Sequence, residues 1–76
     1  MNALNISPEW GKNIINNKKP DGQYIFKEHG IITAVDVTDG EVTVEKFNLK
    51  SQADKWLIGI PAKNADGKWL NMPNTR

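Results

Sequence analysis

Hydrophobic and polar positions change their spacing along this chain, and the change separates strands from helices. In residues 23–47 apolar and polar residues alternate, and β-branched and aromatic types are frequent, which is typical of strands. His29-Gly30 and Asp39-Gly40 interrupt the alternation, and Asp-Gly is a favoured two-residue hairpin turn. Residues 23–47 are therefore predicted to form a three-stranded antiparallel sheet.

Helical spacing is found on both sides of this region. Ser7, followed by Pro8, is a favourable helix start, and the segment 16–20 should end an N-terminal helix over residues 7–17. Ser51 and Asp54 resemble a capping box before the apolar stripe that contains Trp56, which predicts a second helix over 51–58. A turn at 66–67 then precedes residues 68–72, where a fourth short strand is expected.

The hairpin turns determine which side chains share a face of the predicted sheet. A two-residue turn at Asp39-Gly40 pairs Val37 with Val42 and Val35 with Val44. One face then carries Tyr24, Phe26, Ile31, Val35, Val37, Val42 and Val44. We expect this valine face to be the core face, covered by the segment that contains Trp56.

The second face of the sheet is a mixture of polar and apolar groups. It carries Gln23, Ile25, Lys27, Ile32, Ala34, Asp36, Thr43, Glu45 and Phe47. Its apolar members are either covered by the N-terminal helix or form an exposed patch that marks a protein-binding surface. We take the second face as the open one.

Length and composition limit the chain to one small α+β domain over residues 1–76. With 76 residues, a second core would leave each half below the ~50 residues that usually fold alone. The expected fold is a three- or four-stranded antiparallel sheet with one packed C-terminal helix and a short N-terminal helix. Of the three tryptophans, Trp56 is expected in the core, and Trp10 and Trp69 are expected as core or lid residues.

The side chains offer little material for catalysis. The chain has no cysteine, and its single histidine, His29, lies in a predicted turn without ligand or triad partners. Glu41 and Glu45 stand four apart on one strand and are interpreted as solvated side chains rather than an acid–base pair. Enzymatic activity, a cofactor and a metal site are therefore not expected.

Charge and hydropathy argue against nucleic acid and membrane as partners. Ten basic and nine acidic residues give a net charge of +1, far from the basic excess of typical nucleic-acid-binding domains. No apolar run approaches the ~20 residues of a membrane span, and no targeting segment is visible, so we expect a cytoplasmic protein. A three-stranded sheet followed by a helix does occur in some DNA-binding modules, which leaves a DNA-binding accessory domain as an alternative.

Several segments resemble a known family. The segments Glu28-His29-Gly30, Ala34-Val35-Asp36, Asp39-Gly40, Phe47 and the run 51–61 are similar to small phage-encoded anti-CRISPR proteins of the type I-F class. The shared spacing is a phenylalanine, a tryptophan nine residues later, then a bulky pair, glycine, an aliphatic residue and proline, within about half of the chain.

This resemblance implies a fold and a function. The fold is an antiparallel sheet flanked by helices, and the function is to bind the backbone subunit of the CRISPR surveillance complex in a bacterial host and block hybridisation of target DNA, without catalysis. The implied contact surface lies on the sheet and includes an acid on the second strand, which matches Asp36. Lys27 stands where the family has a tyrosine, so a different host target is an alternative.

The sequence thus favours a non-catalytic protein-binding module that inhibits a host protein complex by steric occupation. Apolar area would supply affinity and charges would supply orientation. The residues predicted to bind the partner are Gln23, Ile25, Lys27, Ile32, Asp36 and Glu45. A structural homodimer joined through Ile25, Ile32 and Phe47 is a further alternative.

Overall fold

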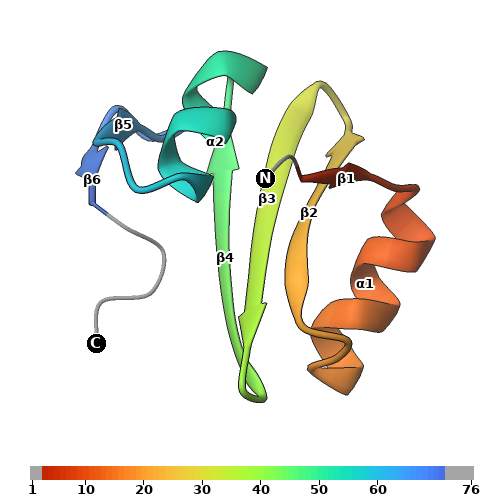
Figure 1. The fold of residues 1–76 in the computed structure, drawn as a ribbon. Helices are drawn as coiled ribbons and strands as arrows, with labels where there is room; N and C mark the ends of the chain where they lie inside the picture. The colour runs from red at the N-terminus through yellow and green to blue at the C-terminus, as the bar shows by residue number, and fades with distance from the viewer. Residues whose placement is uncertain (1–2, 72–76) are drawn as a thin grey trace.

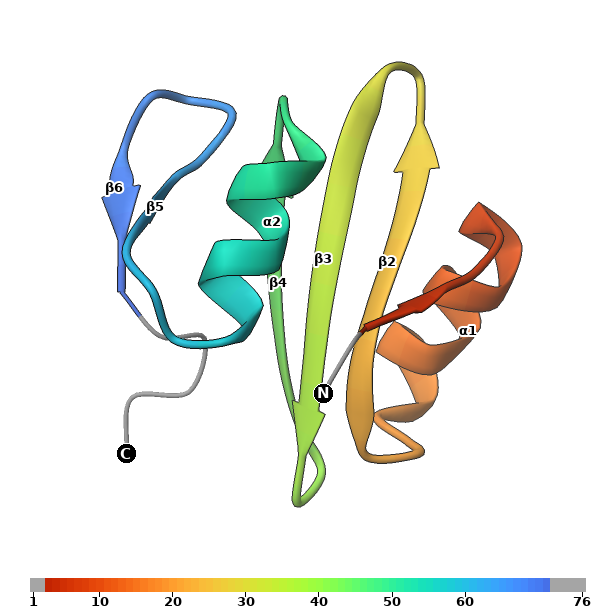
Figure 2. The same cartoon turned by 45° about the horizontal axis from the view of Figure 1, so that its top comes forward.

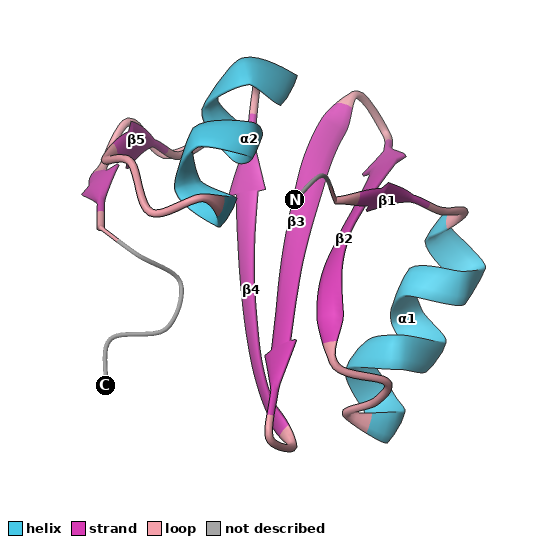
Figure 3. Ribbon diagram, in the orientation of Figure 1, coloured by secondary structure: helices cyan, strands magenta, loops and turns pink. Residues whose placement is uncertain are grey.

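The computed structural model describes residues 3–71 and has an α+β fold, which confirms the predicted class (Figure 1). Its elements, in chain order, are β1 (Leu4–Asn5), α1 (Pro8–Asn17), β2 (Gly22–Glu28), β3 (Ile31–Thr38), β4 (Glu41–Phe47), α2 (Lys50–Leu57), β5 (Ala62–Lys63) and β6 (Trp69–Leu70). Figure 3 shows these helices and strands by type.

The meander of β2, β3 and β4 has the predicted antiparallel register. Val37 pairs with Val42, and Val35 pairs with Val44 on one side and Tyr24 on the other. Asp39 and Gly40 have φ angles of 52° and 78°, the left-handed conformation that a two-residue turn of type I′ requires at both positions. The turn residues therefore set the register across the sheet.

The fourth strand of this sheet lies at the N-terminus of the chain. β1 pairs in parallel with β2, Leu4 opposite Tyr24, and the strand order is β1-β2-β3-β4. The expected strand over 68–72 corresponds to β6, which pairs only with β5 in a separate two-stranded sheet; residue 72 lies outside the described residues. The prediction of a wholly antiparallel sheet is thus corrected at its β1 edge.

The start of α1 is capped as predicted. The backbone N–H of Trp10 donates a hydrogen bond of 3.2 Å to the Ser7 Oγ, and Lys18 ends the helix in a left-handed conformation with φ 58°. α1 packs on the valine face of the sheet, where the buried side chains are Ile14, Tyr24, Phe26, Val35 and Val37. The N-terminal helix thus covers the face that we assigned to α2.

Gly11 allows α1 to approach this face closely. A Cβ added at Gly11 would overlap the ring of Phe26, which is itself buried. The missing side chain therefore sets the distance between the helix and β2.

We expect Gly11→Ala to destabilise the protein by about 1–2 kcal/mol, because crowding the Phe26 ring outweighs the better helix propensity of alanine. The matched control is Asn13→Ala at an exposed position of the same helix, which should raise stability by up to about 0.5 kcal/mol. Urea denaturation followed by circular dichroism measures both. Two changes of the same sign would contradict this packing.

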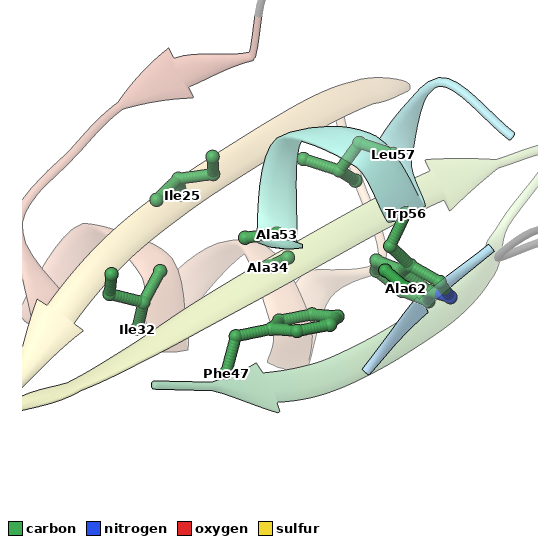
Figure 4. Close-up of a cluster of buried hydrophobic side chains, with 8 residues drawn as sticks. All are labelled: Ile25, Ile32, Ala34, Phe47, Ala53, Trp56, Leu57 and Ala62. Carbon is green, nitrogen blue, oxygen red and sulfur yellow. The ribbon is translucent and has the colours of Figure 1, made fainter. Parts of the chain in front are cut away.

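α2 covers the face that we expected to be open. Figure 4 shows it above the side chains of β2, β3 and β4 on this face. The buried cluster there consists of Ile25, Ile32, Ala34, Phe47, Ala53, Trp56, Leu57 and Ala62. The rings of Phe47 and Trp56 lie 5.7 Å apart at an angle of 47°, an arrangement typical of a tilted aromatic pair.

The assignment of helices to faces was wrong because both faces carry enough apolar residues to hold a helix. What separates them is shape: the small side chains of Ala34 and Ala53 lie next to each other where α2 packs on β3 (Figure 4), whereas Phe26 on the opposite face fits against Gly11. The capping prediction also fails, since α2 begins at Lys50 after Leu49 and its N-terminus receives no side-chain hydrogen bond. Ser51 lies inside the helix.

Candidate functional site

The residues predicted to bind a partner do not form one open surface. Ile25, Ile32 and Asp36 are buried at 4%, 9% and 7% exposure, Gln23 and Glu45 are half-buried, and only Lys27 is exposed. The prediction of an open second face is therefore wrong, because α2 lies over the apolar part of it.

Gln23 and Asp36 belong to a hydrogen-bond network that attaches α2 to the sheet. The Gln23 Nε2 donates to the Asp36 Oδ2 at 3.0 Å and to the Leu57 carbonyl oxygen at 2.6 Å. The Thr38 Oγ1 donates to the other Asp36 oxygen at 2.8 Å. Both carboxylate oxygens of Asp36 thus have partners inside the molecule, and its role here is structural.

Glu45 and Lys27 lie on opposite sides of α2, away from this network. The Glu45 Oε1 accepts a hydrogen bond of 3.4 Å from the Asn64 Nδ2 in the hairpin of β5 and β6. Lys27 stands opposite Ile32 on the neighbouring strand and projects into solvent. Neither residue is joined to the others of the predicted set.

Large apolar side chains are exposed elsewhere on the surface. They are Leu4, Trp10, Leu49, Ile58, Ile60 and Trp69. Trp10 and Trp69 are 57% and 66% exposed, so the expectation that both would serve the core or a lid is wrong. Exposed tryptophans are unusual, because their large apolar area is favourable to bury.

Two of these side chains line the same groove. We call it the Leu49–Trp69 groove; its volume is about 370 Å³, and its lining residues are Asn48, Leu49, Gln52, Lys63, Asn64, Ala65, Gly67 and Trp69. Leu49 is 60% exposed at the start of α2, and Trp69 comes from β6. The lining residues come from the start of α2 and from the hairpin of β5 and β6; Figure 2 shows where these elements lie.

Hydrogen bonds hold the hairpin in place beside α2. The Gln52 Oε1 accepts from the backbone N–H of Lys63 at 2.9 Å, which joins the helix to β5. Within the hairpin, the Asn64 Oδ1 accepts from the backbone N–H groups of Asp66 and Lys68 at 3.0 and 2.9 Å. Trp69 is therefore displayed by a supported turn, which lowers the entropy lost when a partner binds it.

The sequence contained only weak indications of this groove. The turn at Asp66-Gly67 next to Trp69 was visible, but β5 and β6 are two residues each and too short for periodicity to reveal. The exposure of Trp69 depends on that pairing, so it could not be found without the structure.

The shifted pKa values belong to structural contacts. A hydrogen bond from the Lys12 Nζ, at 2.9 Å, lowers the pKa of Glu28 and links α1 to the end of β2. Burial, and then the charge of Asp21, raise the pKa of Tyr24, whose hydroxyl donates to the Pro20 carbonyl oxygen at 2.7 Å. Neither group lines the Leu49–Trp69 groove.

Two observations concern metal and membrane. Within residues 3–71, no three histidine, aspartate or glutamate side chains are grouped so that they could hold a metal ion. Neither α1 nor α2 has the length and apolar character needed to cross a bilayer.

Comparison with protein-family models, with curated proteins and with solved structures finds no match for this chain.

Proposed function

We propose that this protein is a protein-binding module that inhibits a larger host complex by occupying part of its surface, without catalysing a reaction. The observation that carries the proposal is the pair of exposed anchors, Leu49 and Trp69, on one groove. Binding energy at protein interfaces is concentrated in a few large side chains, tryptophan foremost, that fit pockets of the partner.

The charges beside this groove indicate the kind of surface it would meet. Lys63 lines the groove and Lys68 precedes Trp69, and both are exposed. Lys50, at the start of α2, is already paired with Asp54 at 3.2 Å. Neither Lys63 nor Lys68 forms an ion pair with another of residues 3–71, and two such lysines around an apolar anchor favour a partner with an acidic rim, whose charges would orient the docking.

The resemblance to type I-F anti-CRISPR proteins supplies the partner to test first. On this proposal a phage or other mobile element produces the protein inside a bacterial host, where it binds the backbone subunit of the CRISPR surveillance complex. Target DNA would then be excluded by steric occupation.

The two alternatives fit the fold less well. DNA binding by a sheet in the major groove needs a sheet face without a helix, and α1 and α2 pack on opposite faces. A homodimer through Ile25, Ile32 and Phe47 would need side chains that are buried within one chain. Neither alternative makes use of Leu49 or Trp69.

We expect the purified protein to prevent a type I-F surveillance complex from binding labelled target DNA in a gel-shift assay. Trp69→Ala should weaken this inhibition at least ~10-fold, since truncation of an interface tryptophan commonly costs ~2 kcal/mol or more. Trp10→Ala is the matched control, because Trp10 has similar exposure but lies on α1; it should stay within ~2-fold.

Failure to inhibit at a large molar excess would reject the surveillance complex as the target. Equal weakening by both tryptophan variants would reject the groove as the contact. Direct binding of the labelled DNA without the complex, with affinity falling steeply as salt rises, would favour the DNA-binding alternative.

A further inference from the structure

β4 is an edge strand whose outward backbone groups are partly free. β4 is last in the strand order and pairs only with β3 (Figure 1). Thr38 and Glu41 flank a two-residue turn and so form the first hydrogen-bonded pair of this hairpin. From this pair onward, hydrogen-bonded and non-hydrogen-bonded pairs alternate along β3 and β4. The N–H and C=O groups of Val42, Val44 and Lys46 therefore point away from β3.

One contact confirms that these backbone groups point outward, and it shortens the part of β4 that is free. The backbone N–H of Ala65 donates from outside the sheet to the Lys46 carbonyl oxygen at 2.8 Å. In the part of the chain from 3 to 71, no backbone group bonds to Val42 or Val44 on this side. The free edge therefore consists of the outward groups of these two valines.

The two faces of this edge differ in character. Glu41, Thr43 and Glu45 alternate with Val42 and Val44, so the carboxylates stand on the α2 side and the valines on the α1 side. Both valines are half-buried against the cluster beneath α1, which packs over β2 and β3. An added strand would extend the sheet and cover the exposed part of these valines.

A second copy of the chain is a poor occupant of the edge. Antiparallel self-pairing centred on Val44 would use the Lys46 carbonyl oxygen, which already accepts from Ala65. A shift that pairs Val42 with Val44 of the other copy places Glu41 opposite Glu45 twice, and like charges in directly opposed positions are destabilising. A partner strand of different sequence that pairs only with Val42 and Val44 avoids both problems. It does not need the Lys46 carbonyl oxygen, and it need not place a carboxylate opposite Glu41 or Glu45.

We propose that the free edge of β4 accepts an extended segment of a partner protein as an added strand, with lysine or arginine facing Glu41 and Glu45 and aliphatic residues facing Val42 and Val44. Main-chain hydrogen bonds would supply affinity and the alternating side chains specificity. A hollow of about 370 Å³ at the end of this edge, lined by Val44, Glu45, Lys46 and residues 64–66, gives the end of the segment space beside the hairpin. This site is separate from the Leu49–Trp69 groove and does not depend on the inhibitory function.

The test uses two fluorescent heptapeptides as probes, one alternating lysine with valine and one alternating glutamate with valine. We expect the full-length protein to bind the Lys-Val peptide at least ~10-fold more tightly by fluorescence anisotropy, because only this peptide complements the carboxylates. Glu41→Lys combined with Glu45→Lys should reverse the preference, since both side chains face solvent at least in part. Equal affinities, or an unchanged preference in this variant, would overturn the proposal.

Backbone participation is tested separately at Val44. Val44→Pro removes an outward N–H and no bond to β3, so the sheet should form while peptide affinity falls at least ~10-fold. Val44→Thr, which keeps the amide and the branched shape, is the matched control and should bind within ~3-fold of the parent.

Amide hydrogen exchange shows whether the β4 edge is free, and it does not depend on the folding of Val44→Pro. The amides of Val42 and Val44 should exchange fast in the free protein and slowly with the Lys-Val peptide. Slow exchange in the free protein would overturn the proposal. Combined with a doubled mass in sedimentation it would show self-pairing, and combined with a monomer mass it would show that the edge is already covered within one chain.

Discussion

We expect Trp56→Ala to lower the free energy of unfolding by about 4 kcal/mol, the largest effect of any single truncation at a tryptophan in this chain. Trp56 is 2% exposed and packs against Phe47 with the two rings tilted, so truncation leaves a cavity between α2 and the sheet. A domain of 76 residues has a total stability on the order of 4–11 kcal/mol, so this one truncation should remove at least about a third of it.

Circular dichroism during urea denaturation measures this effect without depending on the removed fluorophore. The midpoint should fall by several molar, because m is about 1 kcal/mol/M for a small protein. Trp10→Ala and Trp69→Ala are controls at exposed positions and should each change stability by less than ~0.5 kcal/mol. Similar losses for all three would show that α2 does not pack as described.

We expect Ile32→Glu to destabilise the protein by more than about 3 kcal/mol. The change removes a buried aliphatic side chain and places a carboxylate in the apolar cluster beneath α2, where the loss of hydration outweighs attraction to the solvent-exposed Lys27 on the neighbouring strand. Lys27→Glu is the control, because Lys27 stands directly opposite Ile32 but is exposed, and it should be nearly neutral.

Thermal denaturation and size-exclusion chromatography together distinguish this outcome from the homodimer alternative. A dimer joined through Ile32 would give, after Ile32→Glu, a folded monomer that keeps a cooperative melting transition and loses only the stabilisation contributed by dimerisation. We expect instead a melting temperature lowered by more than ~12 °C, since about 1 kcal/mol corresponds to 4–8 °C in a domain of this size.

The sequence contained the strand register but not the placement of the helices. The turns at His29-Gly30 and Asp39-Gly40, with the alternation around them, determine each cross-strand pair from Gly22 to Phe47, because a two-residue turn leaves no freedom to slip. Ser7 likewise marks the beginning of α1. These are local signals, carried by residues that are neighbours in the chain.

The candidate site could not be found from local signals. The choice of face for α2 depends on how its buried side chains, Ala53 and Trp56 among them, fit those of the sheet. This fit arises only when segments that are far apart in the sequence come together. β1, β5 and β6 have two residues each, which is too short for an alternating pattern to predict them. As a result the predicted surface was mostly buried, while Trp69, expected as a core or lid residue, is the most exposed large apolar side chain within residues 3–71.

The two tight turns of the meander also bear on how quickly the chain can fold. Each strand from Gly22 to Phe47 is joined to its neighbour by a two-residue turn. Little chain entropy is therefore lost in closing the loop before the strand pairs contribute favourable free energy. The contact of Leu4 with Tyr24 is the exception, since it joins residues twenty positions apart. Nucleation at the hairpins, followed by docking of β1, is the order that this topology favours.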